Sequence, residues 1–344
     1  MKCRSIVIQR FCQPDSSSPD IPDLYRPLPQ LPESVTQRTA ISTSLPIARL
    51  CLFSLLTAVS VHASPFKTIG LVSAWDPEMN ALKRAVLTPD AKVRNTEIDG
   101  TVFSEAQQGG RRLVIWMSGV SMINAAMSTQ LAIDHFHPDA ILFSGIAGGL
   151  DPSFQPGDVV IHAQWIHQAE AAWLNPDPKR PGSYVIPEYF RPRYPNFGNI
   201  FPDDVWVVRK GERKPQQVHA FAVDPDLLDL AQVTAPRVSI RRPDGSKAKV
   251  VIGGTGMSGP IFLDDRSFRD FAFQKWHARI HEMEGTAIAQ VGYYNRVPIL
   301  IVRALSDLAG GQSGVNQEER NSEFAASNAA EVTAKILERI ESAQ

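Results

Sequence analysis

Cysteine is scarce in this sequence, and its three copies lie near one end of the chain. Cys3, Cys12 and Cys51 all precede residue 64, so residues 64–344 carry no thiol that an oxidising compartment would attack. An excess of charge is also missing, because 35 basic and 36 acidic side chains leave a formal net charge of -1. This balance argues against a nucleic-acid partner and is typical of an ordinary globular protein.

A hydrophobic run long enough to span a membrane is lacking too. The apolar core at about residues 50–61 contains Ser and Thr and is too short for a transmembrane helix. It follows Arg49 and ends in small residues up to Ala63, as a secretory signal does, although a short buried helix is the competing interpretation. We therefore predict a disordered, Pro- and Ser-rich leader over residues 1–63 and one folded domain over residues 64–344.

The position of this signal is unusual, because secretory signals start at the N-terminus. Either translation begins nearer residue 45 or the leader is exceptionally long. In both cases we expect export to the periplasm or the exterior, with no membrane attachment after processing.

Strands and helices alternate after the leader. Apolar runs of strand length occur at 68–73, 112–118, 139–144, 158–161, 249–252 and 297–302. The clearest helical stripe is formed by Ala329, Val332, Ile336, Leu337 and Ile340. Further helices are expected from residues 78, 121, 224 and 285. The second of these has Ile123, Met127 and Leu131 at fourfold spacing. This alternation predicts an α/β fold with parallel strands.

The alternation is lost between about residues 172 and 215. This segment is dense in Pro and aromatic residues and shows little periodicity. A loop of this length inside a compact domain is usually functional or disordered. Its aromatic residues favour an ordered lid or an interface over a plain surface insertion.

Three carboxylates stand out by their positions. Glu78, Glu284 and Asp307 each lie just after a predicted strand or at the start of a predicted helix. Each alone is compatible with a helix cap or a surface charge. If the strands are neighbours in one sheet, all three converge on one edge and outline a cleft with an acid, a base and a hydroxyl acceptor.

Two glycine-rich segments and a pair of histidines have competing interpretations. Gly145–Gly149 follows a buried strand, where glycines let backbone N–H groups approach a ligand; the alternative is a tight turn. Gly254–Gly259 matches G-x-G-x-x-G, but an extended segment follows it, which favours a plain loop over a dinucleotide site. His277 and His281 lack a metal-site pattern, so we expect neither a metal nor a cofactor.

Taken together, these segments resemble the nucleoside phosphorylase superfamily. In its hydrolytic motifs the sequence is most similar to the 5′-methylthioadenosine/S-adenosylhomocysteine nucleosidases. The resemblance covers residues 67–344 except the insertion, and its motifs are Ile69–Glu78, Ser118–Ala126, Ser144–Leu150, Gly157–Val160, Glu282–Gly285 and Val302–Asp307. It implies a three-layer α/β/α sandwich around a mixed, twisted central sheet, with a catalytic domain over residues 64–344.

The resemblance also implies roles for individual residues in hydrolysis of a purine nucleoside. Glu78 resembles the general base that deprotonates the attacking water, with Arg303 near both. Asp307 resembles the acid that hydrogen-bonds purine N7 and helps the base to leave. Glu284 resembles the acceptor for the ribose 2′- and 3′-hydroxyls, with Met283 packing on the sugar.

Further residues are expected around the substrate from the same motifs. Ser306 would support the acid, and the pocket would be lined by Trp75, Ile146, Ala147, Gly148, Phe262 and Leu263. Ile146 stands where the nucleosidases have a serine, and Trp75 stands where they have a methionine. Gly310–Gly314 does not supply the aromatic residue that usually covers the base.

Three functions remain open on this basis. A purine nucleosidase that uses water is favoured, and a phosphate-dependent purine nucleoside phosphorylase, which would need arginines placed for phosphate, is the second. Ser306–Gly311 and the aromatic insertion also resemble the plant bark and vegetative storage proteins, so a non-catalytic nucleoside-binding protein is the third. We expect a small-molecule purine nucleoside as partner and a homo-oligomer, with a dimer favoured.

Overall fold

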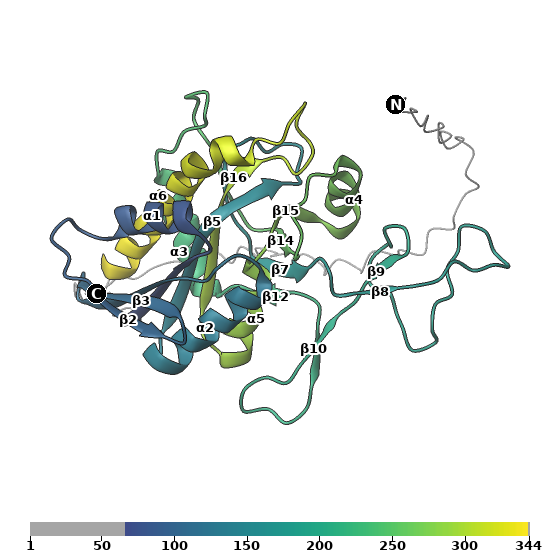
Figure 1. The fold of residues 1–344 in the computed structure, drawn as a ribbon, viewed down its shortest axis with the longest axis horizontal. Coiled ribbons are helices and arrows are strands. Elements are labelled where there is room, and N and C mark those ends of the chain that lie inside the picture. Colours follow the sequence, from purple (N-terminus) through teal and green to yellow (C-terminus); the bar gives the residue numbers. More distant parts are fainter. Residues whose placement is uncertain (1–65, 343–344) are drawn as a thin grey trace, which may run out of the picture. The chain divides into compact units, whose positions relative to one another are not determined.

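A mixed β-sheet with helices on both faces runs through residues 66–342, the part of the chain that the structure, a computed structural model, describes (Figure 1). The strands are β1 (Thr68–Ser73), β2 (Arg94–Ile98), β3 (Thr101–Gln108), β4 (Arg111–Met117), β5 (Ala140–Gly149), β6 (Val159–Ile161), β7 (Gln164–His167), β8 (Ala171–Trp173), β9 (Ile200–Pro202), β10 (Val205–Val207), β11 (Gln216–Val218), β12 (Phe221–Ala222), β13 (Val250–Ile252), β14 (Thr255–Ser258), β15 (Ala278–Glu282) and β16 (Ile299–Asp307). The helices are α1 (Asp76–Val86), α2 (Met122–Phe136), α3 (Pro225–Thr234), the short 3-10 helix η1 (Ala235–Arg237), α4 (Arg266–Trp276), α5 (Gly285–Asn295) and α6 (Glu318–Ser342).

The leader and secretory signal predicted for residues 1–63 lie outside the described residues. Within residues 66–342, no helix is both long and apolar enough to cross a bilayer.

Strand β5 is central to the sheet. The main path has the order β12-β7-β14-β15-β5-β1-β4-β3-β2, and β16 pairs with both β5 and β6. Strands β1 and β16 run parallel to β5, with Leu71 opposite Leu142 and Arg303 opposite Gly145, whereas β15 runs antiparallel to it. The sheet is therefore mixed, as the family resemblance implied, and not purely parallel as the alternation of strands and helices predicted.

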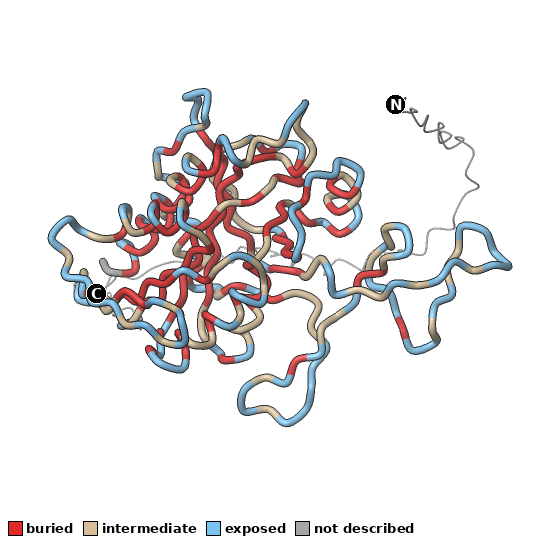
Figure 2. The backbone as a smooth tube through the Cα atoms, viewed as in Figure 1, coloured by how far each residue is buried: buried red, intermediate tan, exposed pale blue. Residues whose placement is uncertain are grey.

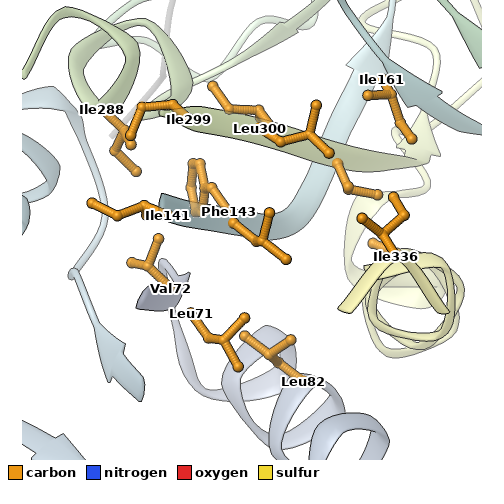
Figure 3. Packing of buried hydrophobic residues seen from close by; sticks show 14 of the residues in the cluster. Leu71, Val72, Leu82, Ile141, Phe143, Ile161, Ile288, Ile299, Leu300 and Ile336 are labelled. Atoms are coloured by element: carbon orange, nitrogen blue, oxygen red, sulfur yellow. The ribbon is translucent and has the colours of Figure 1, made fainter. Parts of the chain in front are cut away.

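Helices cover both faces of this sheet. Helix α1 packs against α6 on one face, and α2 packs against α5 on the other. Figure 3 shows Leu82 of α1 next to Leu71 of β1, while Ile288 of α5 lies beside Ile299 of β16. Buried residues follow the central strands and the helix sides that face them (Figure 2). The predicted three-layer α/β/α sandwich is confirmed.

Local sequence signals set the ends of several helices. Helix α1 begins at Asp76 with Pro77 in its first turn, where the missing N–H costs no hydrogen bond. At the start of α3 the Asp224 side chain accepts a hydrogen bond from the Leu227 N–H at 3.0 Å. The stripe predicted for the last helix is buried against the sheet in α6: Ala329, Val332, Ile336, Leu337 and Ile340.

Two strands are longer than predicted. β5 continues through Gly145–Gly149 and β16 continues through Asp307, because the two strands pair with each other along this length. Gly145–Gly149 is therefore an extended strand, and the alternative interpretation of a tight turn is wrong. Most of Gly254–Gly259 is also strand rather than a plain loop, since β14 lies between β7 and β15.

Helix α2 packs with a different side than its apolar stripe indicated. Ile123 and Met127 are 82% and 53% exposed, so the stripe that identified this helix does not face the core. The buried side instead carries small residues such as Ala125 and Ala132, which let the helix lie close to its neighbours. Fourfold spacing identifies a stripe, but it does not tell which element covers it.

The segment 172–215 has more regular structure than predicted. Strand β8 pairs with β9 and β10 pairs with β11, each pair antiparallel. The Pro195 carbonyl accepts a hydrogen bond from Trp276 Nε1 at 2.8 Å, and the Phe197 ring centre lies 5.1 Å from that of Phe268, so the segment is anchored on α4. None of residues 172–215 lines the cavity described in the next section.

Candidate active site

A cavity of about 260 Å³ lies where β1, β5 and β16 end. The carboxyl ends of strands are the usual place for a site in an α/β sheet. The lining residues within 66–342 are Ala74, Trp75, Glu78, Val120, Ile146, Ala147, Gly148, Ile261, Phe262, Leu263, His281, Glu282, Met283, Glu284, Ser306, Asp307 and Glu318. The structure therefore brings Glu78, Glu284 and Asp307 into one cavity.

Arg303 is fully buried behind this wall and holds three glutamates. Its Nη2 contacts the Glu282 carboxylate and lies 3.2 Å from Glu284 Oε2, and its Nη1 lies 3.6 Å from Glu78 Oε1. Its guanidinium carbon lies 3.8 Å from the ring centre of Phe143. A single cation cannot neutralise three buried carboxylates, so part of the cluster retains a proton.

Glu78 lies in the first turn of α1 and is held by two backbone groups. Its Oε2 accepts a hydrogen bond from the Ala74 N–H and its Oε1 accepts one from the Ile146 N–H, both at 2.8 Å. Burial raises the pKa of the Glu78 carboxyl, and Arg303 and the two N–H groups oppose that rise. A fixed carboxylate with a raised pKa is suited to act as a general base.

Glu284 occupies the N-cap position of α5. Its Oε1 accepts a hydrogen bond from the Ser121 N–H at 2.7 Å. Burial and the neighbouring Glu282 raise the pKa of the Glu284 carboxyl to about 8, against the opposing effect of Arg303. At neutral pH this carboxyl therefore carries a proton.

Asp307 is the last residue of β16. Its Oδ1 accepts hydrogen bonds from the Ala309 N–H at 2.7 Å and from Asn316 Nδ2 at 3.3 Å, and its Oδ2 accepts one from Ser306 Oγ at 2.8 Å. Burial raises the pKa of Asp307 in spite of these three donors. Ser306 Oγ also lies 3.4 Å from the Ala147 carbonyl. The hydroxyl can turn to that acceptor, which leaves Oδ2 free to carry a proton.

The other residues expected around the substrate are placed at the same cavity, with one exception. Those that line it are Trp75, Ile146, Ala147, Gly148, Phe262, Leu263, Met283 and Ser306. The exception is Arg303, which does not line the cavity and acts on it through the glutamates. Ile146 contributes its backbone N–H to Glu78.

Two glycines of β5 make these close approaches geometrically possible. A Cβ at Gly145 would overlap Arg303 Nη1 and lie 2.6 Å from Glu78 Oε1. A Cβ at Gly148 would lie 3.0 Å from Asp307 Oδ1. Both positions are extended strand, so the absence of a side chain matters here, and not an unusual backbone angle.

Sequence reasoning assigned no role to Glu282, Asn316 or Glu318. Glu282 accepts hydrogen bonds from the Gly285 N–H, the shorter at 2.8 Å, and its place inside the Glu282–Gly285 motif was a usable signal. Asn316 and Glu318 lie at the end of an irregular loop and had no such signal.

Burial lowers the pKa of His281 to about 4, so this lining residue is neutral at pH 7. No group of three His, Cys, Asp or Glu residues within 66–342 could hold a metal ion.

We predict that Glu284→Gln weakens the decline of stability with rising pH. The pKa of this carboxyl is about 8 in the folded chain against an ordinary value of 4.5, so the folded state binds the extra proton between these values. The free energy of unfolding therefore falls as pH rises through that window, by about 1.4 kcal/mol per pH unit for one proton. Urea unfolding from pH 5 to pH 8 measures the slope. An unchanged slope in Glu284→Gln, equal to that of the exposed control Glu331→Gln, would contradict the assignment.

Comparisons with known proteins agree with the motifs and the fold. The family model described as the phosphorylase superfamily matches residues 68–341. The 5′-methylthioadenosine/S-adenosylhomocysteine nucleosidase of Mycobacterium tuberculosis is 30% identical over 267 residues, which cover 76% of this chain and 94% of that protein. The enzyme of the same name from Staphylococcus carnosus is 29% identical over 273 residues, covering 79% of this chain and all of the relative.

A solved structure shows the same relationship. The nucleosidase of that name from Neisseria meningitidis, in complex with methylthio-immucillin-A, has a TM-score of 0.58 and 25% identity, and the match covers 79% of this chain and 98% of that one. The residues matched by the family model, 68–341, include Glu78, Glu284 and Asp307. The chain is therefore a member of the phosphorylase superfamily.

Proposed function

We propose that the chain hydrolyses the N-glycosidic bond of a purine nucleoside of the adenosine type and releases the base. The observation that carries the proposal is the arrangement of Glu78, Glu284 and Asp307 around one cavity, each with a raised pKa. The names of the relatives, 5′-methylthioadenosine/S-adenosylhomocysteine nucleosidases, support this substrate class.

At one end of the cavity the carboxylates act on the sugar. Glu78 takes a proton from water as its oxygen bonds to C1′, and the C1′–N9 bond breaks with its electron pair going to the base. Positive charge develops on the sugar during this step, and carboxylates fixed nearby stabilise it. The same charge favours ionisation of Glu284, whose oxygens then accept hydrogen bonds from the ribose hydroxyls.

At the other end Asp307 serves the leaving base. Its protonated Oδ2 donates to purine N7 and neutralises the negative charge that the base acquires. The proton taken up by Glu78 returns to Asp307 through solvent, which closes the cycle. The Ala309 N–H and Asn316 Nδ2, which both donate to Oδ1, keep the Asp307 carboxyl in place during this transfer.

Water is favoured over phosphate as the nucleophile. The acidic and basic side chains that line the cavity within residues 66–342 are four glutamates, one aspartate and the neutral His281. The nearest buried cation, Arg303, is already shared among three glutamates. A phosphate dianion would be repelled by the carboxylates here. No basic side chain is available to offset the free energy that the dianion loses when it leaves water.

We predict that Asp307→Asn abolishes base release while substrate binding is largely kept. The amide has nearly the same shape but cannot transfer a proton, so a loss of about 100-fold or more is expected in kcat. Chromatography of bases released from a nucleoside panel, with and without phosphate, measures the effect. Normal turnover by the variant would refute the role of Asp307, and strict dependence on phosphate in the wild type would refute hydrolysis.

We also propose that the chain forms a homodimer through α2. The exposed Ile123 and Met127 lie on one helix with Met117 and Val120 just before it, and Val120 also lines the cavity. Contiguous exposed apolar surface marks an interaction site. The formal net charge of -1 places little repulsion between two copies.

For this interface, Ile123→Asp is predicted to convert dimer to monomer. The side chain is 82% exposed, so the fold tolerates the charge, whereas burial of an unpaired carboxylate in the interface is costly. Light scattering gives the mass. The control Val233→Asp, on exposed surface of α3, should leave the mass unchanged. A monomeric wild type would rule the interface out.

Finally, we propose that the leader is removed during export, in line with the signal predicted before residue 64. The exported protein is expected to begin near residue 64, as N-terminal sequencing would show. Full-length chain retained in the cell would count against this.

A further inference from the structure

Glu318 is a cavity-lining carboxylate that the proposed chemistry does not use. It is the first residue of α6, and it lines the cavity near Asp307, which is among the charges that act on it. Within residues 66–342, no backbone or side-chain donor is bonded to its carboxylate oxygens, so their acceptor capacity is free. The sugar-side pair Glu78 and Glu284 does not act on it.

The side chain of Asn316 links the backbone of Glu318 to the side chain of Asp307. Its Oδ1 accepts a hydrogen bond from the Glu318 N–H at 2.8 Å. Its Nδ2 donates to Asp307 Oδ1 at 3.3 Å and to Asp264 Oδ1 at 3.0 Å. Asp264 is itself bonded to Gln312 Nε2 at 2.7 Å and does not line the cavity. Glu318 is therefore the free carboxylate that accompanies Asp307 at this end.

The hydrogen-bonding groups on the edge of a purine indicate what Asp307 and Glu318 could bind together. Beside N7, a 6-amino purine presents an N–H donor, whereas a 6-oxo purine presents a second acceptor. If protonated Asp307 donates to N7, an acceptor next to Asp307 faces the substituent at position 6. A donor and an acceptor in this order match the 6-amino base and oppose the 6-oxo base.

We propose that Glu318 determines specificity for the base, by accepting a hydrogen bond from the 6-amino group and repelling a 6-oxo group. The inference rests on the proposed function, because Asp307 must face N7 for Glu318 to face position 6. Glu318 is a specificity-determining residue and takes no part in proton transfer. A helix-terminal role alone, in which acidic residues favour the N-terminus of α6, would not depend on the base.

The test compares Glu318→Gln with the wild type on 5′-methylthioadenosine and 5′-methylthioinosine, which differ only at position 6. The ratio of kcat/KM for the amino over the oxo substrate is expected to fall about tenfold or more, because a hydrogen bond to a charged acceptor is lost. The amide of Gln also offers a donor to the 6-oxo group. Glu319→Gln, the exposed neighbour with the same charge change at the same helix end, is expected to keep the wild-type ratio.

The outcomes separate the two claims. An unchanged ratio in Glu318→Gln, or an equal loss on both substrates, overturns the specificity role while hydrolysis stands. If the wild type releases base from neither nucleoside, the proposed function fails. Calorimetric binding of adenine and hypoxanthine then decides the role of Glu318: a ratio of Kd values that shifts in Glu318→Gln alone supports it, and an unshifted ratio ends it.

Discussion

The buried guanidinium of Arg303 is the constraint on which the rest of the site depends. It contacts Glu282 and Glu284 through one nitrogen and faces Glu78 with another. Removing a charge from such a cluster leaves its partners buried and unpaired, at a cost of about 3–5 kcal/mol. Even so, one cation cannot balance three buried carboxylates, so the three do not all ionise at neutral pH. Burial and the neighbouring Glu282 keep the pKa of Glu284 near 8, against the opposing effect of Arg303.

The fold places different groups at the two ends of one cavity. At one end, Glu78 of α1 and Glu284, the N-cap of α5, meet around Arg303 of β16, and Gly145 leaves room for that contact. At the other end, Asp307 receives three hydrogen bonds and keeps a raised pKa because it is buried. The parallel pairing of β5 with β16 fixes the separation of the two ends. Asp307 ends β16, and Glu78 of α1 accepts a hydrogen bond from the Ile146 N–H of β5 and faces Arg303 of β16, so this pair of strands holds both carboxyls in position.

Much of this arrangement is visible in the sequence. The strand at residues 68–73, the cap at Asp224 and the stripe of α6 follow from local signals, and the ordered motifs point to the three carboxylates. The extension of β5 through Gly145–Gly149 depends on pairing with a strand more than a hundred residues away, which no local pattern encodes. The exposed side of α2 and the place of Glu318 depend in the same way on what packs nearby. The raised pKa values follow from burial, which only the fold determines.

The account rests on water attacking C1′ of a nucleoside in this cavity, and isotope labelling tests that step most directly. The reaction is run in ¹⁸O-labelled water and quenched at once by borohydride, because reduction stops exchange of the anomeric oxygen with water. The mass of the sugar product is then measured by mass spectrometry. The account predicts release of a purine base together with a sugar that carries one ¹⁸O atom. A sugar phosphate, an unlabelled sugar, or no base release from any purine nucleoside would contradict it.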